Sequence, residues 1–166
     1  MRVVVQRVRW AEVEADGKVV GRVERGLLAY VGVGVDDAPA EADYLAEKVA
    51  HLRIFDDEDG KLNRSVQDVR GGVLAVPNFT LMADARKGRR PSFEAAAPGE
   101  TAGPLHERFV EALKRCGCQV ACGAFGQHMI IRSAADGPVN VILETPPRGA
   151  SGRRGKAGEA KEGEPG

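Results

Sequence analysis

The first segment of this chain that could do chemistry is Pro-Asn-Phe-Thr-Leu, residues 77–81, and its strongest groups belong to the backbone. It follows an apolar run, 73–76, that is typical of a buried strand, and Pro77 ends the hydrogen-bond ladder because proline has no N–H. The backbone N–H groups of Asn78, Phe79 and Thr80 are therefore expected to point away from neighbouring strands, and Thr80 adds a hydroxyl. Such a turn could bind the negative charge that develops on an oxygen during acyl transfer.

The second segment, Asp-Gly-Pro-Val at residues 136–139, also offers backbone groups more than side chains. Gly137 precedes Pro138 just ahead of a strand-like run, 139–143, and a Gly-Pro bond is a candidate for the cis form. Judged by residue types alone, both segments are also compatible with ordinary turns at the ends of strands. The chemical interpretation is a site built mainly from backbone atoms.

Positive charge gathers shortly after the first segment. Residues 86–90 read Arg-Lys-Gly-Arg-Arg, in a chain whose 24 basic and 24 acidic residues give a formal net charge of zero. Such a chain has no global field that would attract nucleic acid, so any contact with RNA must be local. The cluster of Arg86, Lys87, Arg89 and Arg90 is predicted either to bind phosphates or to be simply solvated.

The usual acid–base and metal-binding side chains show no recognisable pattern. Three histidines, at positions 51, 106 and 128, have no obvious orienting carboxylate and are interpreted as surface or structural residues. Cys116, Cys118 and Cys122 form an odd, clustered set without the spacing of paired zinc ligands. This set argues against a disulfide framework, and we expect neither a metal nor a cofactor.

A sheet and two helices are predicted to position these segments. Strands are expected at 2–8, 10–15, 18–24, 27–35, 73–76, 119–124, 128–133 and 139–143. One helix is expected to be capped by Asp36 or Asp37, with Pro39 in its first turn, and a second to begin at Pro104 and stop at Gly117. With 166 residues, 43% of them hydrophobic, the chain can bury one sizeable core. The predicted fold is a single α+β domain with a curved, barrel-like, mixed or antiparallel sheet packed with two main helices.

The composition changes near the end of the chain. Residues 146–166 are dominated by Gly, Pro, Ala, Lys, Arg and Glu and cannot bury enough surface to offset their ordering entropy. We therefore expect a domain at 1–145 and a disordered tail at 146–166, with weak contact of the tail to RNA as the alternative. The first residues do not resemble a signal peptide, and no apolar run approaches the roughly 20 residues of a spanning helix. A cytoplasmic protein with no membrane partner is expected.

Several stretches of the chain, in this order and spacing, together resemble one known family. They are Val5–Val8, Gly26–Leu28, Arg53–Asp56, Gly60–Asn63, Phe79–Leu81, Gly88–Phe93 and Asp136–Val139. The chain resembles the D-aminoacyl-tRNA deacylases of the bacterial and eukaryotic type. Two motifs depart from the family's pattern: Pro77 and Asn78 stand where the family usually has Ser and Gln, and Ala135 and Asn140 where it usually has Asn and Thr.

The resemblance implies a metal-independent homodimeric esterase. Its substrates would be D-aminoacyl-tRNA and glycyl-tRNA mischarged on alanine tRNA, and its products free tRNA and the D-amino acid or glycine. On the family's pattern, a cis Gly137-Pro138 pair from one subunit enters the site of the other and binds the α-amino group with its carbonyls. An L side chain is excluded because no room is left for it, whereas achiral glycine passes. Arg7 would brace the pair.

The remaining site residues are implied in the same way. Thr80, with Phe79 and Asn78, would form the catalytic turn, and Pro77 would line the substrate site. Thr80 is expected to orient substrate or water more than to attack, because no base stands ready to activate it. The basic cluster would bind the tRNA.

Two functions of other classes stay open at this point. The four departures could leave a catalytically impaired module that only binds the tRNA acceptor end. A thiol-dependent or zinc-dependent enzyme centred on Cys116, Cys118 and Cys122 is the other. Consumption of the ester separates the first from a deacylase, and elemental analysis with thiol blocking separates the second.

Overall fold

A computed structural model describes residues 1–146, so the predicted tail lies, apart from Pro146, outside the described residues. In chain order the elements are β1 (Arg2–Ala15), β2 (Lys18–Val23), β3 (Gly26–Gly32), α1 (Pro39–Ala50), β4 (Phe55–Asp56), β5 (Leu62–Arg64), β6 (Gly72–Pro77), the 3-10 helix η1 (Phe79–Met82), α2 (Gly99–Arg115), β7 (Gln119–Cys122) and β8 (Met129–Glu144).

β1 organises the main sheet because it is paired along both edges. One edge pairs antiparallel with β8, while the other pairs antiparallel with β3 at residues 2–8 and with β2 at residues 11–15. From β3 the sheet continues through parallel pairs to β6 and then β7. The sheet therefore mixes parallel and antiparallel pairs, as the sequence allowed.

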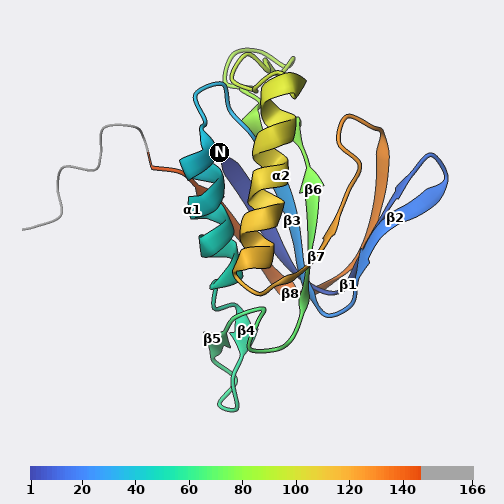
Figure 1. Cartoon of the computed structure of the whole chain (residues 1–166), viewed down its shortest axis with the longest axis vertical. Helices are drawn as coiled ribbons and strands as arrows, with labels where there is room; N and C mark the ends of the chain where they lie inside the picture. The colour runs from blue at the N-terminus through green and yellow to red at the C-terminus, as the bar shows by residue number, and fades with distance from the viewer. Residues whose placement is uncertain (147–166) are drawn as a thin grey trace, which may run out of the picture.

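The two ends of this strand path, β2 and β7, curl toward each other. A Cβ on Gly21 of β2 would lie 2.5 Å from the carbonyl oxygen of Cys122 in β7, so only glycine permits this approach. The sheet is consequently a nearly closed barrel (Figure 1). This confirms the predicted curved α+β architecture.

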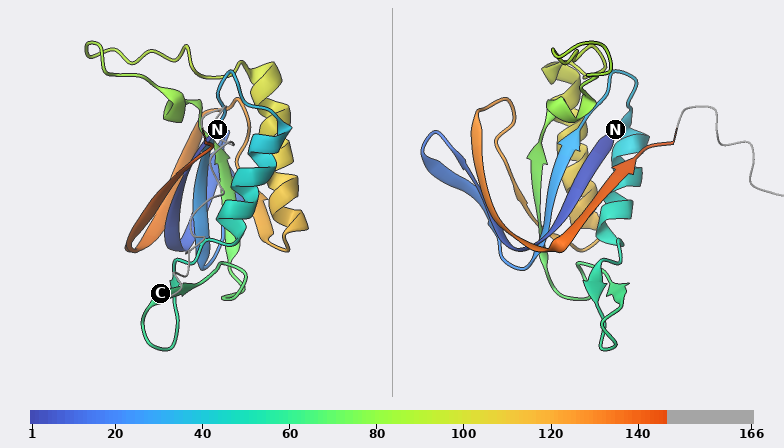
Figure 2. Two further views of the ribbon diagram at one scale, coloured as in Figure 1. Left: turned by 90° about the vertical axis from the view of Figure 1, so that its left-hand side faces the viewer. Right: turned by 180° about the vertical axis from the view of Figure 1, so that it is seen from behind.

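The two main helices lie side by side on one face of the sheet (Figure 1 and Figure 2). α1 starts with Pro39 in its first turn, as predicted, and buries Leu45 and Val49; α2 buries Phe109 and Leu113. A large apolar core fills the space between helices and sheet. A second, smaller cluster lies inside the barrel and contains Val8, Ala11, Val13, Val23, Leu28, Leu74 and Val76.

Four predictions about where elements begin, end or are capped were wrong. The strands expected at 2–8 and 10–15 are one strand, β1, and those at 128–133 and 139–143 are joined in β8. α2 begins at Gly99, so Pro104 lies inside it. Asp37 does not cap α1: Ala38 is the N-cap, and the Asp37 carboxylate binds the N-terminal amine and accepts the Gly34 N–H. Among residues 1–146, no helix is both long and apolar enough to cross a membrane.

Candidate active site

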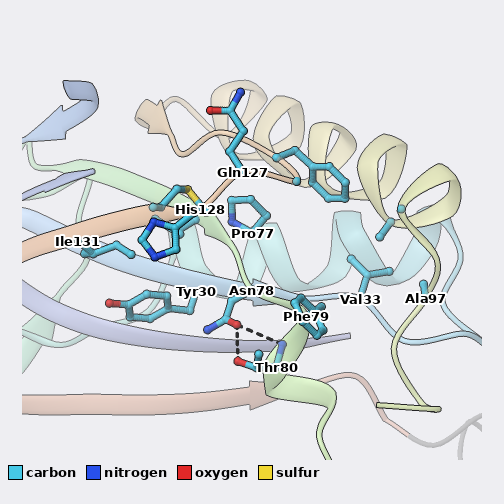
Figure 3. Close-up of a pocket in the computed structure, with 16 residues that line it drawn as sticks. Tyr30, Val33, Pro77, Asn78, Phe79, Thr80, Ala97, Gln127, His128 and Ile131 are labelled. Atoms are coloured by element: carbon cyan, nitrogen blue, oxygen red, sulfur yellow. Dashed lines mark hydrogen bonds between the residues drawn. The ribbon is translucent and has the colours of Figure 1, made fainter. Parts of the chain in front are cut away.

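A cavity of about 680 Å³ opens where β6 ends (Figure 3). Its walls come from β3, from the turn that follows β6, from the start of α2 and from the segment that leads into β8. Much of the lining is apolar, including Val33, Ala97 and Phe125, while Tyr30, Asn78 and His128 add polar groups. Such a mixture of apolar wall and few polar groups is typical of a small-molecule or cofactor site.

The turn from Pro77 to Thr80, for which the sequence analysis predicts a chemical role, lines this cavity. Pro77 is the last residue of β6, and the chain then turns into η1. The Asn78 N–H donates to the Val31 carbonyl at 2.8 Å. Its side-chain Oδ1 accepts both the Thr80 N–H at 3.1 Å and the Thr80 hydroxyl at 2.5 Å.

These bonds correct the expectation that three N–H groups are free. Those of Asn78 and Thr80 are occupied, so of the three only the Phe79 N–H lacks an acceptor within residues 1–146. The Thr80 hydroxyl gives its proton to Asn78, which leaves oxygen lone pairs for an incoming donor. The turn thus offers one backbone donor and one hydroxyl acceptor to a ligand.

Sequence reasoning missed three polar side chains of the cavity, Tyr30, Gln127 and His128. His128 was interpreted as a surface or structural residue, yet its exposed imidazole lines the cavity. Tyr30 lies across from it, and burial raises the pKa of its phenol, which therefore stays protonated at neutral pH (Figure 3). A tyrosine within the otherwise aliphatic run 27–35 was the signal that could have been noticed.

The basic cluster lies on a segment that projects beyond the body of the domain (yellow-green in Figure 2). Its base is closed by mutual backbone hydrogen bonds of 2.8 Å between Asp84 and Ser92. The ring of Phe93 packs edge-on against that of Phe79, with ring centroids 5.2 Å apart. The segment is therefore in direct contact with the turn that follows β6.

The four charges of this cluster are not equivalent. The Arg86 guanidinium donates to both carboxylate oxygens of Asp84, with Nη2 2.7 Å from Oδ2. These side-chain hydrogen bonds lower the pKa of Asp84 to about 2. Lys87, Arg89 and Arg90 are exposed and form no ion pair within the described chain. Three cations are thus available to phosphates, while the fourth is already paired.

Gly137 and Pro138 sit in a bulge of β8, and the bond between them is cis. Gln6 pairs with Asn140 and Val8 with Ala135, so the four residues 136–139 of β8 stand opposite Arg7 alone. We call residues 136–139 the β8 bulge. Both Gly137 and Pro138 are exposed.

Arg7, for which a bracing role is predicted, lies buried beside the β8 bulge. Its Nε donates to the Asp136 carbonyl at 3.1 Å, and Nη1 donates to the Ile54 carbonyl at 2.7 Å. The carboxylates of Asp56 and Asp136 lie 3.4 and 3.6 Å from the guanidinium. The positive charge is therefore compensated on two sides.

Within one chain the bulge and the cavity are far apart. Arg7 is in register with Leu27 and, through it, with Val73, whereas Pro77 lies four residues further along β6, about 13 Å at the rise of a strand. β8 and β6 are also three strand spacings apart, about 14 Å. Accordingly, neither Gly137 nor Pro138 lines the cavity of its own chain.

The cysteines offer little reactivity. All three are free, and burial raises the pKa of Cys118 to about 11 and also raises that of Cys122, which disfavours a thiolate at neutral pH. Within residues 1–146, no group of three or more His, Cys, Asp or Glu residues could hold a metal ion. His106 is buried next to Phe125, away from the thiols, and burial lowers its pKa to about 4.

Comparison with known proteins gives a consistent picture. The family model described as D-Tyr-tRNA(Tyr) deacylase matches residues 4–144. The D-aminoacyl-tRNA deacylase of Caldicellulosiruptor bescii is 55% identical over 145 residues, which are 87% of this chain and 97% of that protein. The D-aminoacyl-tRNA deacylase of Rhodopirellula baltica is 50% identical over 144 residues, 87% of this chain and 99% of that protein.

Solved structures agree with these matches. A c-Myc DNA unwinding element binding protein superposes with a TM-score of 0.82 at 35% identity, covering 88% of this chain and 99% of its own. A probable eukaryotic D-amino acid tRNA deacylase has the same fold, with a TM-score of 0.74 at 18% identity over 86% of this chain and 97% of its own. Because the family model and the close relatives span nearly all of the described domain, the chain belongs to the D-Tyr-tRNA(Tyr) deacylase family.

Proposed function

We propose that this protein hydrolyses the ester bond of D-aminoacyl-tRNA, and of glycyl-tRNA mischarged on alanine tRNA, releasing free tRNA and the D-amino acid or glycine. Family membership and the names of its relatives support this activity. The observation that carries it is the unpaired Phe79 N–H beside the Thr80 hydroxyl at the wall of a cavity. Acyl transfer needs such a donor for the oxyanion that develops on the ester carbonyl.

Hydrolysis of this ester requires few catalytic groups from the protein. An aminoacyl ester is already a reactive acyl donor, and the neighbouring ribose 2′-hydroxyl can assist the attack, so holding ester and water in place provides much of the rate. In this proposal the Phe79 N–H binds the carbonyl oxygen as charge develops on it. Thr80, whose hydroxyl proton is held by Asn78, accepts a hydrogen bond from substrate or water instead of attacking.

The departures from the family pattern are compatible with activity. Asn78 is one methylene shorter than the usual Gln, yet its Oδ1 reaches both polar groups of Thr80. Asn140 accepts a hydrogen bond from Gln6 at 3.0 Å, so this replacement is integrated between β8 and β1. Neither contact favours the catalytically impaired module over an enzyme.

Chiral selection is proposed to require a homodimer. The Gly137-Pro138 pair is exposed and remote from the cavity of its own chain, as expected for a part that enters a partner's cavity. Within the part of the chain that the structure describes, β8 pairs only with β1, and its exposed Ile130 and Ile142 leave an apolar margin that a second copy would cover. The inserted carbonyls would then bind the α-amino group and exclude an L side chain.

The tRNA acceptor end is proposed to rest on the projecting basic segment. Lys87, Arg89 and Arg90 supply unpaired charge, with Arg86 contributing less while Asp84 holds it. Contacts of this kind position the substrate without reading its sequence. This fits an enzyme that must act on many tRNAs.

The direct test is hydrolysis of matched D-tyrosyl-, L-tyrosyl- and glycyl-tRNA, with and without a metal chelator. Chelator-resistant cleavage of the D and glycyl esters but not of the L ester is expected. Binding of the D ester without cleavage would instead establish the impaired module. Loss of cleavage with a chelator or after thiol blocking would support the zinc-dependent or thiol-dependent enzyme centred on Cys116, Cys118 and Cys122.

A further inference from the structure

The β4–β5 hairpin, residues 54–64, contains two of the family-like stretches but takes no part in the cavity or in the proposed chemistry. We propose that this hairpin is the support that fixes the β8 bulge, acting through Arg7, and that Asp56 is a positioning residue for chiral selection. This inference rests on the proposed role of Gly137-Pro138 in excluding L substrates. It assigns a function to a segment that the sequence analysis named only for its resemblance to the family.

Arg7 joins the hairpin to the bulge atom by atom. On the hairpin side, Nη1 donates to the Ile54 carbonyl at 2.7 Å and lies 3.4 Å from the Asp56 carboxylate. On the bulge side, Nε donates to the carbonyl of Asp136, the residue directly before Gly137, at 3.1 Å. One planar guanidinium thus transmits the position of the hairpin to the start of the cis pair.

The burial of Arg7 makes this link depend on particular partner groups. Its side chain is only 9% exposed, and a buried guanidinium needs compensating charge and acceptors at fixed positions. Without Asp56, the only carboxylate within 4 Å of it among residues 1–146 is that of Asp136, 3.6 Å away, which also faces the exposed Arg9 at 3.6 Å. On the hairpin side the guanidinium would then keep the Ile54 carbonyl but lose its compensating charge, so the attraction of Asp136 would draw it toward the bulge.

The hairpin is built to stay in place. Phe55 is 1% exposed and anchors its base in the main core, with the Arg25 guanidinium 5.6 Å from the centre of its ring. At the tip, Asp57 Oδ1 accepts two backbone N–H groups at 3.0 Å, and these bonds lower the pKa of Asp57. Arg53 ties the strands together through the Asn63 carbonyl at 2.8 Å. A rigid support of this kind can fix a neighbour, whereas a mobile loop cannot.

The bulge needs such support because its residues have few contacts of their own. Four residues of β8 leave the ladder opposite one residue of β1, and Gly137 and Pro138 face solvent. Their carbonyls must nevertheless stay where they accept an amino group and still exclude a side chain about one methyl group in size. Loosening the support is expected to admit the L ester and to weaken the hold on the D ester, so the ratio of the two rates should fall.

The experiment compares Asp56→Ala with Asp59→Ala in the full-length protein. Asp59 lies in the same hairpin, is exposed, and its nearest charge is Lys61 at 4.0 Å, so it controls for hairpin effects unrelated to Arg7. The values of kcat and KM are measured on D-tyrosyl- and L-tyrosyl-tRNA. For Asp56→Ala we expect the D-to-L ratio of kcat/KM to fall about ten-fold, the loss of one hydrogen bond to a charged group, and Asp59→Ala to keep the parental ratio. Asp56→Glu should restore part of it.

A role of Asp56 in stability alone would predict less folded protein and an unchanged ratio, which would overturn the inference. Should Asp56→Ala fail to fold, Asp56→Asn replaces it, because asparagine keeps the shape of the side chain and removes its charge. A lower D-to-L ratio of kcat/KM in Asp56→Asn would support the inference, and an unchanged ratio would overturn it. Pro138→Ala in the same assay separates the two proposals. If Pro138→Ala lowers the ratio and the Asp56 variants do not, only the hairpin inference fails; if Pro138→Ala leaves it unchanged, the role of the cis pair fails first.

Discussion

The turn at Pro77–Thr80 and the β8 bulge both present backbone groups, but they are held in opposite ways. The turn is held by its own side chain, because Asn78 accepts both polar groups of Thr80 from within the same four residues. The bulge is held from behind, by a buried arginine of β1 that also contacts the hairpin. A self-held turn can accept substitution as long as one short side chain still reaches Thr80, which fits the departures at positions 77 and 78. A bulge that depends on distant groups has less freedom, and the two departures near it, at positions 135 and 140, lie just outside residues 136–139.

The largest effect is expected at the bulge itself. Gly137 has a φ of 142°, and a Cβ there would lie 2.5 Å from the Val139 nitrogen, so Gly137→Ala must displace the pair. We expect a loss of about 100-fold in kcat/KM on D-tyrosyl-tRNA, the cost of misplacing a site by about an ångström. Gly17→Ala is the matched control, because Gly17 also has a positive φ, 72°, but has open space around its Cβ. Equal losses in both variants would mean that general strain, not the bulge, is responsible.

The next effect concerns the brace. Arg7→Lys keeps the charge but cannot bind the Ile54 and Asp136 carbonyls at once, so it should lower the free energy of unfolding by about 1–3 kcal/mol through an unsatisfied buried acceptor. Chemical denaturation measures this value. Arg9→Lys is the control, because Arg9 is exposed and touches only the Asp136 carboxylate at 3.6 Å. A fully stable Arg7→Lys variant would show that the bulge holds itself as the turn does.

A smaller effect is expected at the self-held turn. Thr80→Ala removes one acceptor and Asn78→Ala releases the Thr80 hydroxyl and N–H, so each should lower kcat about ten-fold, the value of one hydrogen bond. Single-turnover hydrolysis of D-tyrosyl-tRNA is the measurement. Complete loss of hydrolysis in a folded Thr80→Ala variant would support Thr80 as a nucleophile. The turn would then be as sensitive to substitution as the β8 bulge.

The smallest effect tests the segment attached to the turn. Removing the charges of Lys87 and Arg89 together should reduce the slope of log binding constant against log salt by about 2, roughly one per phosphate contact. Arg86→Gln should change it less, because Asp84 already pairs with Arg86 at 2.7 Å. Binding of tRNA at several salt concentrations provides the slopes. Identical slopes in all variants would return the cluster to solvated surface charge.

The sequence predicted what local patterns encode. The apolar run before Pro77, the helix with Pro39 in its first turn and the curved mixed sheet were all visible in residue types. The continuity of β8 was not, because a bulge of four residues looks like the gap between two strands. The positions of Tyr30 and His128 in one cavity were also hidden, since they follow from how β3 and the start of β8 come together across about a hundred residues of chain.

The hydrogen bonding of the backbone N–H groups in the turn was the other feature that the sequence could not predict. Which N–H groups are free depends on whether Asn78 folds back onto Thr80 and whether β3 still reaches Asn78 beyond Pro77. Both are matters of a few ångströms that residue types do not specify. The four residues that the sequence analysis named in the turn, Pro77 to Thr80, all line one cavity, and their roles stay predictions.

The pairing of β1 with β8 also governs how this protein is made. Arg2 is in register with Glu144, so the first strand to leave the ribosome lacks the partner of one whole edge until the last strand of the domain has been synthesised. During that time β1 can pair only with β2 and β3, and its other edge stays open to wrong partners, including nascent chains on the same messenger. Completion of the domain therefore requires β8, and the Asp136 carbonyl that Arg7 binds is synthesised 129 residues after Arg7 itself.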